Sequence, residues 1–140
     1  MTRQVLLDTG PLVAFLDKAE RHHAWSVRQF REIAPPLLTC EGVIVEACFL
    51  LQTLPSAIQQ VRTYLETRII QLDFVLSPHI GRVFDLLHTY RNLPMSLADA
   101  CLVCMAEEKE QSRVLTLDSD FKIYRQRGRM PIPLLLPEQT

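Results

Sequence analysis

Four acidic residues of this 140-residue chain lie next to or within apolar segments, where a charged side chain is unexpected: Asp8, Glu46, Asp99 and Asp118. If they meet at one place, two charges about 4 Å apart repel by roughly 4 kcal/mol at an effective dielectric constant near 20. Such a cluster requires protons, basic partners or a divalent cation, and an all-oxygen ligand set suits Mg²⁺ or Mn²⁺ rather than zinc. A water on such an ion can attack a phosphodiester. The residue types therefore indicate metal-dependent phosphodiester hydrolysis.

The positions of the acids suggest that the fold brings them together. Asp8 directly follows the apolar run at residues 5–7, and Asp118 directly follows the run at 113–117, with Asp120 two residues on. Asp99 lies in the first turn of a predicted helix. Glu46 lies in the apolar stripe of another, where an unpaired buried charge would cost several kcal/mol. In open parallel sheets the functional crevice lies beyond the carboxyl ends of the strands, so we expect the acids at that edge.

Each acid also has a purely structural interpretation. Asp8 could make a turn or cap a helix. Asp99 completes a Ser-x-x-acid spacing with Ser96 that resembles a capping box. Glu46 could pair with an arginine in the core, and Asp118 could be a turn residue. All four structural interpretations would have to be true at the same time. A single shared site explains the four positions together and is therefore favoured.

The elements that must position the acids alternate between strands and helices. Strands are predicted at residues 5–7, 37–39, 69–72, 113–117 and 132–136. Helices are predicted at about 11–18, 22–33, 42–54 and 56–67, then from Pro78, from Ser96 and from Asp120 to about Gln126. This alternation predicts an α/β fold with a parallel sheet covered on both faces, built as a single domain over residues 1–140.

The spacing of apolar residues predicts which helix faces are buried. The helix at 42–54 should bury Val43, Ala47, Leu50, Leu51 and Leu54. A helix capped by Ser77 should bury Ile80, Val83, Phe84 and Leu87. The helix from Ser96 is apolar nearly all round as far as residue 106, so it should lie inside the protein.

Composition excludes several classes of protein. Hydrophobic residues make up 48% and charged residues 22%, which is an ordinary globular balance rather than that of a disordered or fibrous chain. The net charge of −1 leaves no overall basic coat for nucleic acid, although a local patch is compatible with it. Apolar runs are too short for a membrane helix or a signal peptide, and the few cysteines indicate free thiols in a reducing cytoplasm.

Four segments resemble the PIN domain family, and most closely its small single-domain members of the VapC toxin type. The matching segments are Leu7-Asp8-Thr9-Gly10-Pro11-Leu12-Val13-Ala14, Val45-Glu46-Ala47, Leu93-Pro94-Met95-Ser96-Leu97-Ala98-Asp99-Ala100 and Val114-Leu115-Thr116-Leu117-Asp118-Ser119-Asp120-Phe121. Their order and spacing match over roughly residues 3–136. Each segment alone is weakly specific, but four in order on an alternating α/β pattern are fairly specific.

The resemblance implies a three-layer α/β/α sandwich with about five parallel strands in the order 3-2-1-4-5. It implies a ribonuclease in which Asp8, Glu46 and Asp99 hold Mg²⁺ or Mn²⁺, with Asp118 bound directly or through water. Asp120 matches a less regular, additional acid of the family. Thr116 matches a Thr or Ser that helps orient a ligand, whereas Thr9, beside Asp8, could be structural. A toxin of this type would be a homodimer neutralised by an antitoxin. The apolar helices at residues 42–54 and 56–67 could supply the dimer face or could equally be part of the core of one chain.

Other motifs carry weaker signals. The pair Cys101-x-x-Cys104 lies on an apolar helix without a second pair, which favours packing thiols over zinc. His22 and His23 could touch RNA phosphate but fit an exposed helix start better. The basic run beginning just beyond Asp118 interleaves with aromatic residues and could hold phosphates, or it could be a solvated helix end. Its cations are Lys122, Arg125, Arg127 and Arg129.

Three alternative functions compete with a toxin ribonuclease. A non-catalytic RNA-binding or scaffold module on the same fold is disfavoured by four intact acids. A nuclease that processes RNA without an antitoxin partner would have the same residues. A receiver-like phosphoacceptor would need an acidic pair after the first strand and a lysine after the last, and the segments Asp8-Thr9-Gly10 and Ile132-Pro133-Leu134 supply neither.

Overall fold

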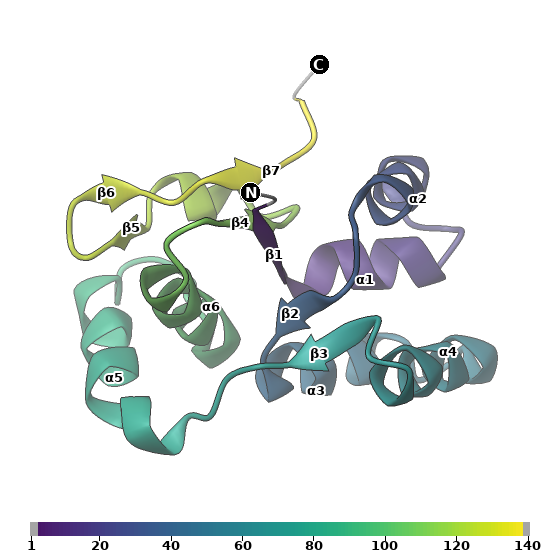
Figure 1. The fold of residues 1–140 in the computed structure, drawn as a ribbon, viewed down its shortest axis with the longest axis horizontal. Helices are drawn as coiled ribbons and strands as arrows, with labels where there is room; N and C mark the ends of the chain where they lie inside the picture. Colours follow the sequence, from purple (N-terminus) through teal and green to yellow (C-terminus); the bar gives the residue numbers. More distant parts are fainter. Residues whose placement is uncertain (1–2, 139–140) are drawn as a thin grey trace.

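The computed structural model describes residues 3–138, which form a five-stranded parallel sheet in the order β3-β2-β1-β4-β7 (Figure 1). The strands are β1 (Gln4–Leu7), β2 (Leu37–Thr39), β3 (Ile70–Leu72), β4 (Ser112–Leu115) and β7 (Leu134–Leu135). In β1, Val5 pairs with Arg113 of β4 and Leu6 with Leu38 of β2. The predicted strand order and the parallel α/β class are confirmed.

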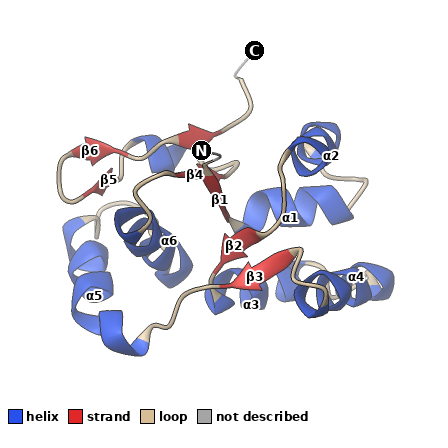
Figure 2. Ribbon diagram, in the orientation of Figure 1, coloured by secondary structure: helices blue, strands red, loops and turns tan. Residues whose placement is uncertain are grey.

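Helices cover both faces of this sheet, as Figure 2 shows with strands in red between two groups of blue helices. The helices are α1 (Thr9–Leu16), α2 (His23–Glu32), α3 (Glu41–Leu50), α4 (Pro55–Glu66), α5 (Ile80–Thr89) and α6 (Leu97–Glu108). Successive strand residues point to opposite faces. Leu6 therefore joins the core under α5 and α6, whereas Val5 and Leu7 join the core under α1 to α4. Two buried faces explain why β1 is a continuous apolar run.

The secondary structure predicted for the basic segment after Asp118 was wrong. A short 3₁₀ helix, η2 (Ser119–Lys122), replaces the helix expected from Asp120 to about Gln126. It is followed by an antiparallel hairpin of β5 (Arg125–Gln126) and β6 (Met130–Pro131). The chain turns through Arg127 at φ 54° and Gly128 at φ 79°. These left-handed conformations cannot continue a right-handed helix.

Other element boundaries also differ from the predictions. Strand β4 ends at Leu115, two residues before the predicted end, and α3 ends at Leu50. Ser77 does not cap α5 through its side chain. Because Leu76 is already in the αR region, Ser77 to His79 instead form the 3₁₀ helix η1 (Ser77–His79).

Three residues predicted to face the core are exposed. Leu50, Ile80 and Phe84 have exposed fractions of 52%, 52% and 54%, while Leu51 and Leu86 are buried. On α3 the predicted face therefore holds apart from Leu50, whereas the buried face of α5 includes Leu86 rather than Ile80 and Phe84. The α6 helix is buried from Ala98 to Ala106, as predicted. Within residues 3–138, no helix is both long and apolar enough to cross a membrane.

Candidate active site

The predicted acids come from four separate elements and line one pocket of about 350 Å³. Asp8 follows β1, Glu46 lies on α3, Asp99 on α6, and Asp118 follows β4. The pocket opens at the carboxyl ends of β1 and β4, because the segment after each of these strands enters it. The pocket thus brings together the four acids that the sequence pattern indicated.

Asp8 is the most enclosed of these acids, with 6% of its surface exposed. Its Oδ1 accepts a hydrogen bond from the Thr9 amide at 2.8 Å, which makes it the N-cap of α1. Its Oδ2 accepts a hydrogen bond from Thr116 Oγ1 at 2.7 Å. The structural interpretation of Asp8 is therefore correct, and it coexists with the position in the pocket.

Asp99 combines a cap with a position in the pocket in the same way. Its amide donates to Ser96 Oγ, and its Oδ2 accepts from the Ser96 amide, both at 3.0 Å. This reciprocal pair is the predicted capping box at the start of α6. It holds the carboxylate, 8% exposed, at the wall of the pocket.

Glu46 does not occupy the buried stripe in which it was expected. It is exposed, because α3 turns Val43 and Ala47 toward the core and leaves Glu46 at the mouth of the pocket. Thr9 Oγ1 donates a long hydrogen bond of 3.4 Å to Glu46 Oε2. The carboxylate is thus directed toward the start of α1, beside Asp8.

Thr116 links the two acids that follow the central strands. Its hydroxyl donates to Asp8 and accepts the Asp118 amide at 2.9 Å. Asp118 Oδ1 in turn accepts the Asp120 amide at 2.9 Å and caps η2. Asp120 itself is partly buried and does not line the pocket.

The site contains two features that the acid pattern alone did not indicate. Ser96 lines the pocket and orients Asp99, for which the Ser-x-x-acid spacing was the available signal. Gly10 also lines it, and a Cβ there would approach Leu117 Cβ to 3.2 Å. The glycine after Asp8-Thr9 therefore allows α1 to start close against the segment that carries Asp118.

Burial and mutual repulsion disfavour ionisation of these carboxyls. Burial is the main cause that raises the pKa of Asp8 to about 7, and the charges of Asp99 and Asp118 add to it. Burial also raises the pKa of Asp99, with contributions from Asp118 and Glu46. A cation in the pocket would reverse both effects, because it favours the charged form.

The donor set fits a hard divalent cation in its chemistry, since all four side chains offer carboxylate oxygens. Among residues 3–138, however, no three acidic, histidine or cysteine side chains are already arranged around one ion position. Asp8 and Asp99 are fixed by hydrogen bonds, whereas Glu46 is exposed at the mouth. Glu46 is accordingly the side chain with most freedom to adjust to an ion.

The predicted RNA-contacting cations do not line the acidic pocket. The Arg125 guanidinium donates to the carbonyls of Lys122, Ile123 and Tyr124. Arg127 donates to the carbonyl of Glu107 at 3.0 Å. Both arginines thus contact their own chain, whereas Lys122 is exposed.

The aromatic residues among these cations are not on the surface. Phe121 and Tyr124 are fully buried and pack edge to face with ring centroids 5.1 Å apart. The aromatic residues that interleave with the cations in the sequence therefore belong to the core and are not available to a ligand. The cause is that η2 and the hairpin turn these rings into the core under α5 and α6.

The cysteines are free, and three of the four are buried: Cys40, Cys101 and Cys104. Cys40 lies beside Cys101, and its Sγ is 4.0 Å from the Ala98 carbonyl. His23 Nδ1 lies 2.7 Å from the Ala14 carbonyl, outside the residues that line the acidic pocket. These placements agree with packing roles for the thiols.

Comparison with known proteins defines the class of this chain. The family model described as "PIN domain" matches residues 5–126, so the chain belongs to the PIN domain family. The fold is similar to the crystal structure of Mycobacterium tuberculosis VapC20, described as a sarcin–ricin loop cleaving toxin. The TM-score is 0.78 at 17% identity, and the match covers 91% of this chain and 100% of that one. No curated protein matches at the sequence level.

Proposed function

We propose that this PIN domain is an endoribonuclease that hydrolyses RNA phosphodiester bonds with the help of Mg²⁺ or Mn²⁺. The observation that carries the proposal is the convergence of Asp8, Glu46, Asp99 and Asp118 on one pocket at the carboxyl ends of the central strands. VapC20, which shares the fold, is described as a sarcin–ricin loop cleaving toxin. At 17% identity that likeness supports the fold and leaves the RNA target of this chain open.

The chain's own residues would position the reaction. Asp8 and Asp99, each fixed by hydrogen bonds, would form the inner part of the metal site, with Glu46 and Asp118 completing it and Asp120 as a secondary acid. A bound Mg²⁺ or Mn²⁺ supplies an activated water and polarises the phosphoryl oxygen. Through these hydrogen bonds, Thr116 holds Asp8 and Asp118 in position relative to each other, and Ser96 holds the Asp99 carboxylate.

The direct test is incubation of the purified protein with a mixed RNA pool, with Mg²⁺, with Mn²⁺ or with a chelator, followed by mapping of the ends produced. Defined ends that appear only with a divalent ion are expected. Binding of the pool without any cleavage, with either metal in excess, would favour a non-catalytic RNA-binding module instead.

Thr116 offers a prediction about positioning of the acids. Thr116→Val keeps the shape but removes the hydroxyl that joins Asp8 to the Asp118 amide. Because partners that orient metal ligands are typically worth about 10–100-fold in metal affinity or activity, we expect a loss of that size. The measurement is cleavage rate against metal concentration, with a shift of the half-maximal metal concentration.

A matched control is Thr39→Val. Thr39 is equally buried, and its hydroxyl donates to the Leu7 carbonyl at 2.7 Å rather than to a carboxylate. It should lose stability but keep its metal dependence. Equal shifts in both variants would contradict a positioning role of Thr116.

We also propose a toxin role in the cytoplasm, with a small antitoxin protein as the partner. The support is membership of the PIN family together with the fold shared with VapC20. Expression of the chain in a bacterial host should arrest growth in proportion to its ribonuclease activity. Relief of that arrest by the product of a neighbouring small gene would identify the partner, and an active but harmless protein would indicate RNA processing instead.

A homodimer through α3 is the proposed assembly. Val45 and Phe49 lie one helical turn apart on α3, with exposed fractions of 70% and 66%. Two large apolar side chains on one exposed stripe favour contact with a partner. Phe49→Asp should therefore halve the mass measured by sedimentation, whereas Phe49→Leu should not. A wild-type protein that sediments as a monomer would contradict this assembly.

A further inference from the structure

A groove runs between α2 and β7 and ends beside the acidic pocket. Two cavities of about 390 and 600 Å³ lie along it and share Gln29 of α2 and Leu135 of β7. A third cavity, of about 280 Å³, shares Arg21 with the second and Leu117 with the acidic pocket. The groove therefore connects the amino ends of the strands with the candidate active site.

The groove is basic. Four arginines line it, and within residues 3–138 none of them forms an ion pair: Arg3, Arg21, Arg28 and Arg113. Two exposed acids, Glu32 and Glu138, also line it, so positive charges exceed negative ones by two. The groove thus has a local excess of positive charge, although the net charge of the whole chain is −1. A polyanion is the ligand that such a surface favours.

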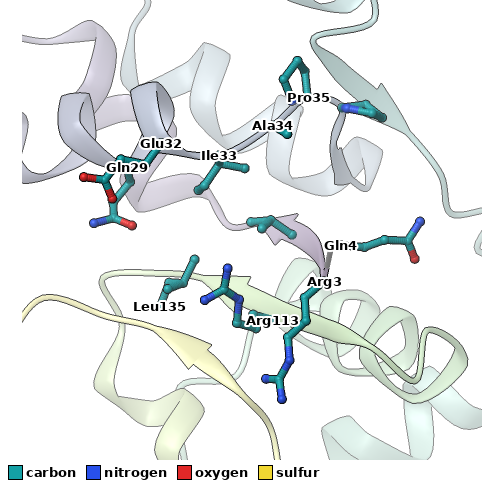
Figure 3. Close-up of a pocket in the computed structure, with 11 residues that line it drawn as sticks. Arg3, Gln4, Gln29, Glu32, Ile33, Ala34, Pro35, Arg113 and Leu135 are labelled. Atoms are coloured by element: carbon teal, nitrogen blue, oxygen red, sulfur yellow. The ribbon is translucent and has the colours of Figure 1, made fainter. Parts of the chain in front are cut away.

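Arg113 carries a second and independent sign of a ligand. It lies on β4 and reaches toward the α2 side chains in Figure 3. Its Nε is buried without a hydrogen-bond partner. Buried polar groups of this kind are rare in folded proteins and call for a specific explanation. If the partly buried side chain turns its Nε toward the cavity, an oxygen of a bound phosphate would supply the missing acceptor.

Trp25 adds a flat aromatic surface to the same groove. It is the single tryptophan of the chain, it lies on α2, and it lines the middle cavity while packing partly against the core under α1 to α4. Aromatic rings between cations are the usual platform on which unpaired bases stack. The ring is held by the core on one side and accessible from the groove on the other.

We propose that this groove binds the backbone of single-stranded RNA and leads it to the acidic pocket, with Arg21 and Arg28 against phosphates and Trp25 stacked on a base. The inference deepens the proposed ribonuclease function and rests on it. It replaces the basic hairpin as the main RNA contact, because Arg125 and Arg127 already contact backbone carbonyls of their own chain.

The first test measures affinity for a fluorescein-labelled single-stranded RNA of mixed sequence against salt, with chelator present so that no cleavage occurs. In Arg21→Gln/Arg28→Gln the slope of log affinity against log salt should fall by about 1.4, since each phosphate contact contributes about 0.7. The control, Arg31→Gln/Arg62→Gln, removes the same charge from α2 and α4 but outside the groove. The salt slope of this control should change by less than half as much as that of Arg21→Gln/Arg28→Gln.

The second test uses Trp25 itself. Because it is the single tryptophan, its fluorescence reports on this groove alone, and unlabelled RNA should quench it in the wild-type protein. Arg113→Met, which keeps the aliphatic stem, should weaken RNA binding about tenfold without lowering the melting temperature, since the Nε that it removes has no partner.

The outcomes separate the groove from the ribonuclease function. The proposal for the groove would be overturned, and the ribonuclease function would stand, if the wild-type protein cleaves RNA and two further results are observed. These are an unchanged salt slope in Arg21→Gln/Arg28→Gln and no quenching of Trp25 by RNA. Quenching of Trp25 by an acidic protein partner but not by RNA would also overturn it. A wild-type protein that neither binds nor cleaves RNA would overturn both proposals.

Discussion

Asp8→Asn and Asp99→Asn are each expected to lower RNA cleavage by at least about 1,000-fold while the protein stays folded. Loss of one charged ligand removes several kcal/mol of electrostatic stabilisation from the reaction, and each 1.36 kcal/mol is a factor of ten in rate. Asparagine can still accept the Thr9 amide at position 8 or the Ser96 amide at position 99. Both helix caps should therefore survive.

The measurement is cleavage rate at saturating metal, together with circular dichroism and melting temperature. Asp85→Asn, an exposed acid on α5 outside the pocket, is the control and should keep full activity. Cleavage by either pocket variant at the wild-type rate would remove that acid from the mechanism. A variant that unfolds would be replaced by Asp118→Asn, for which the same loss of cleavage is expected.

The second large effect is on stability against pH in metal-free buffer. The pKa of Asp8 is raised from 3.8 to about 7 in the folded protein, chiefly by burial. Between these values the folded chain binds more protons than the unfolded chain, so the free energy of unfolding falls as the pH rises. At about 1.36 kcal/mol per pH unit, the loss from pH 4 to 7 approaches about 4 kcal/mol as an upper bound.

Asp8→Asn should remove most of this pH dependence and should be more stable than the wild type above pH 7. Raised pKa values of Asp99 and His79 act in the same direction and remain in the variant, so the difference between the two stability curves is the quantity to measure. Excess Mg²⁺ at pH 8 should restore the stability of the wild-type protein but should not change that of Asp8→Asn. Parallel curves with and without Asp8 would contradict the raised pKa of Asp8 in the folded protein.

Resemblance to the PIN domain family predicted the strand order, whereas the alternation of short apolar runs with amphipathic segments was enough to predict the parallel sheet and the edge at which the acids meet. Such information is local, because a strand buried on both faces must be apolar throughout and a parallel neighbour must be reached through a helix. The roles of Asp8 and Asp99 as helix caps were also readable, since the capping spacing lies within four residues.

Other features depend on contacts between distant segments. Leu50 and Leu51 were both predicted to face the core, but only Leu51 does, and the pattern of adjacent leucines does not distinguish them. The conformation after η2 depends on left-handed dihedrals at Arg127 and Gly128, and on burial of Tyr124 beneath α5 and α6. Glu46 looked buried because its neighbours are apolar, yet α3 presents it to the pocket mouth.

The class of fold and the identity of the clustered acids are readable from local sequence, because strand ends and helix starts are marked by residues next to one another in the chain. Which cations are available to a ligand depends instead on how distant segments pack. Arg125 and Arg127 follow Asp118 closely in the sequence but contact backbone carbonyls, whereas Arg28 and Arg113, far apart in the chain, line one groove. Proximity of charges across a groove is set by the packing of α2 against the sheet, and no local pattern of residues encodes it.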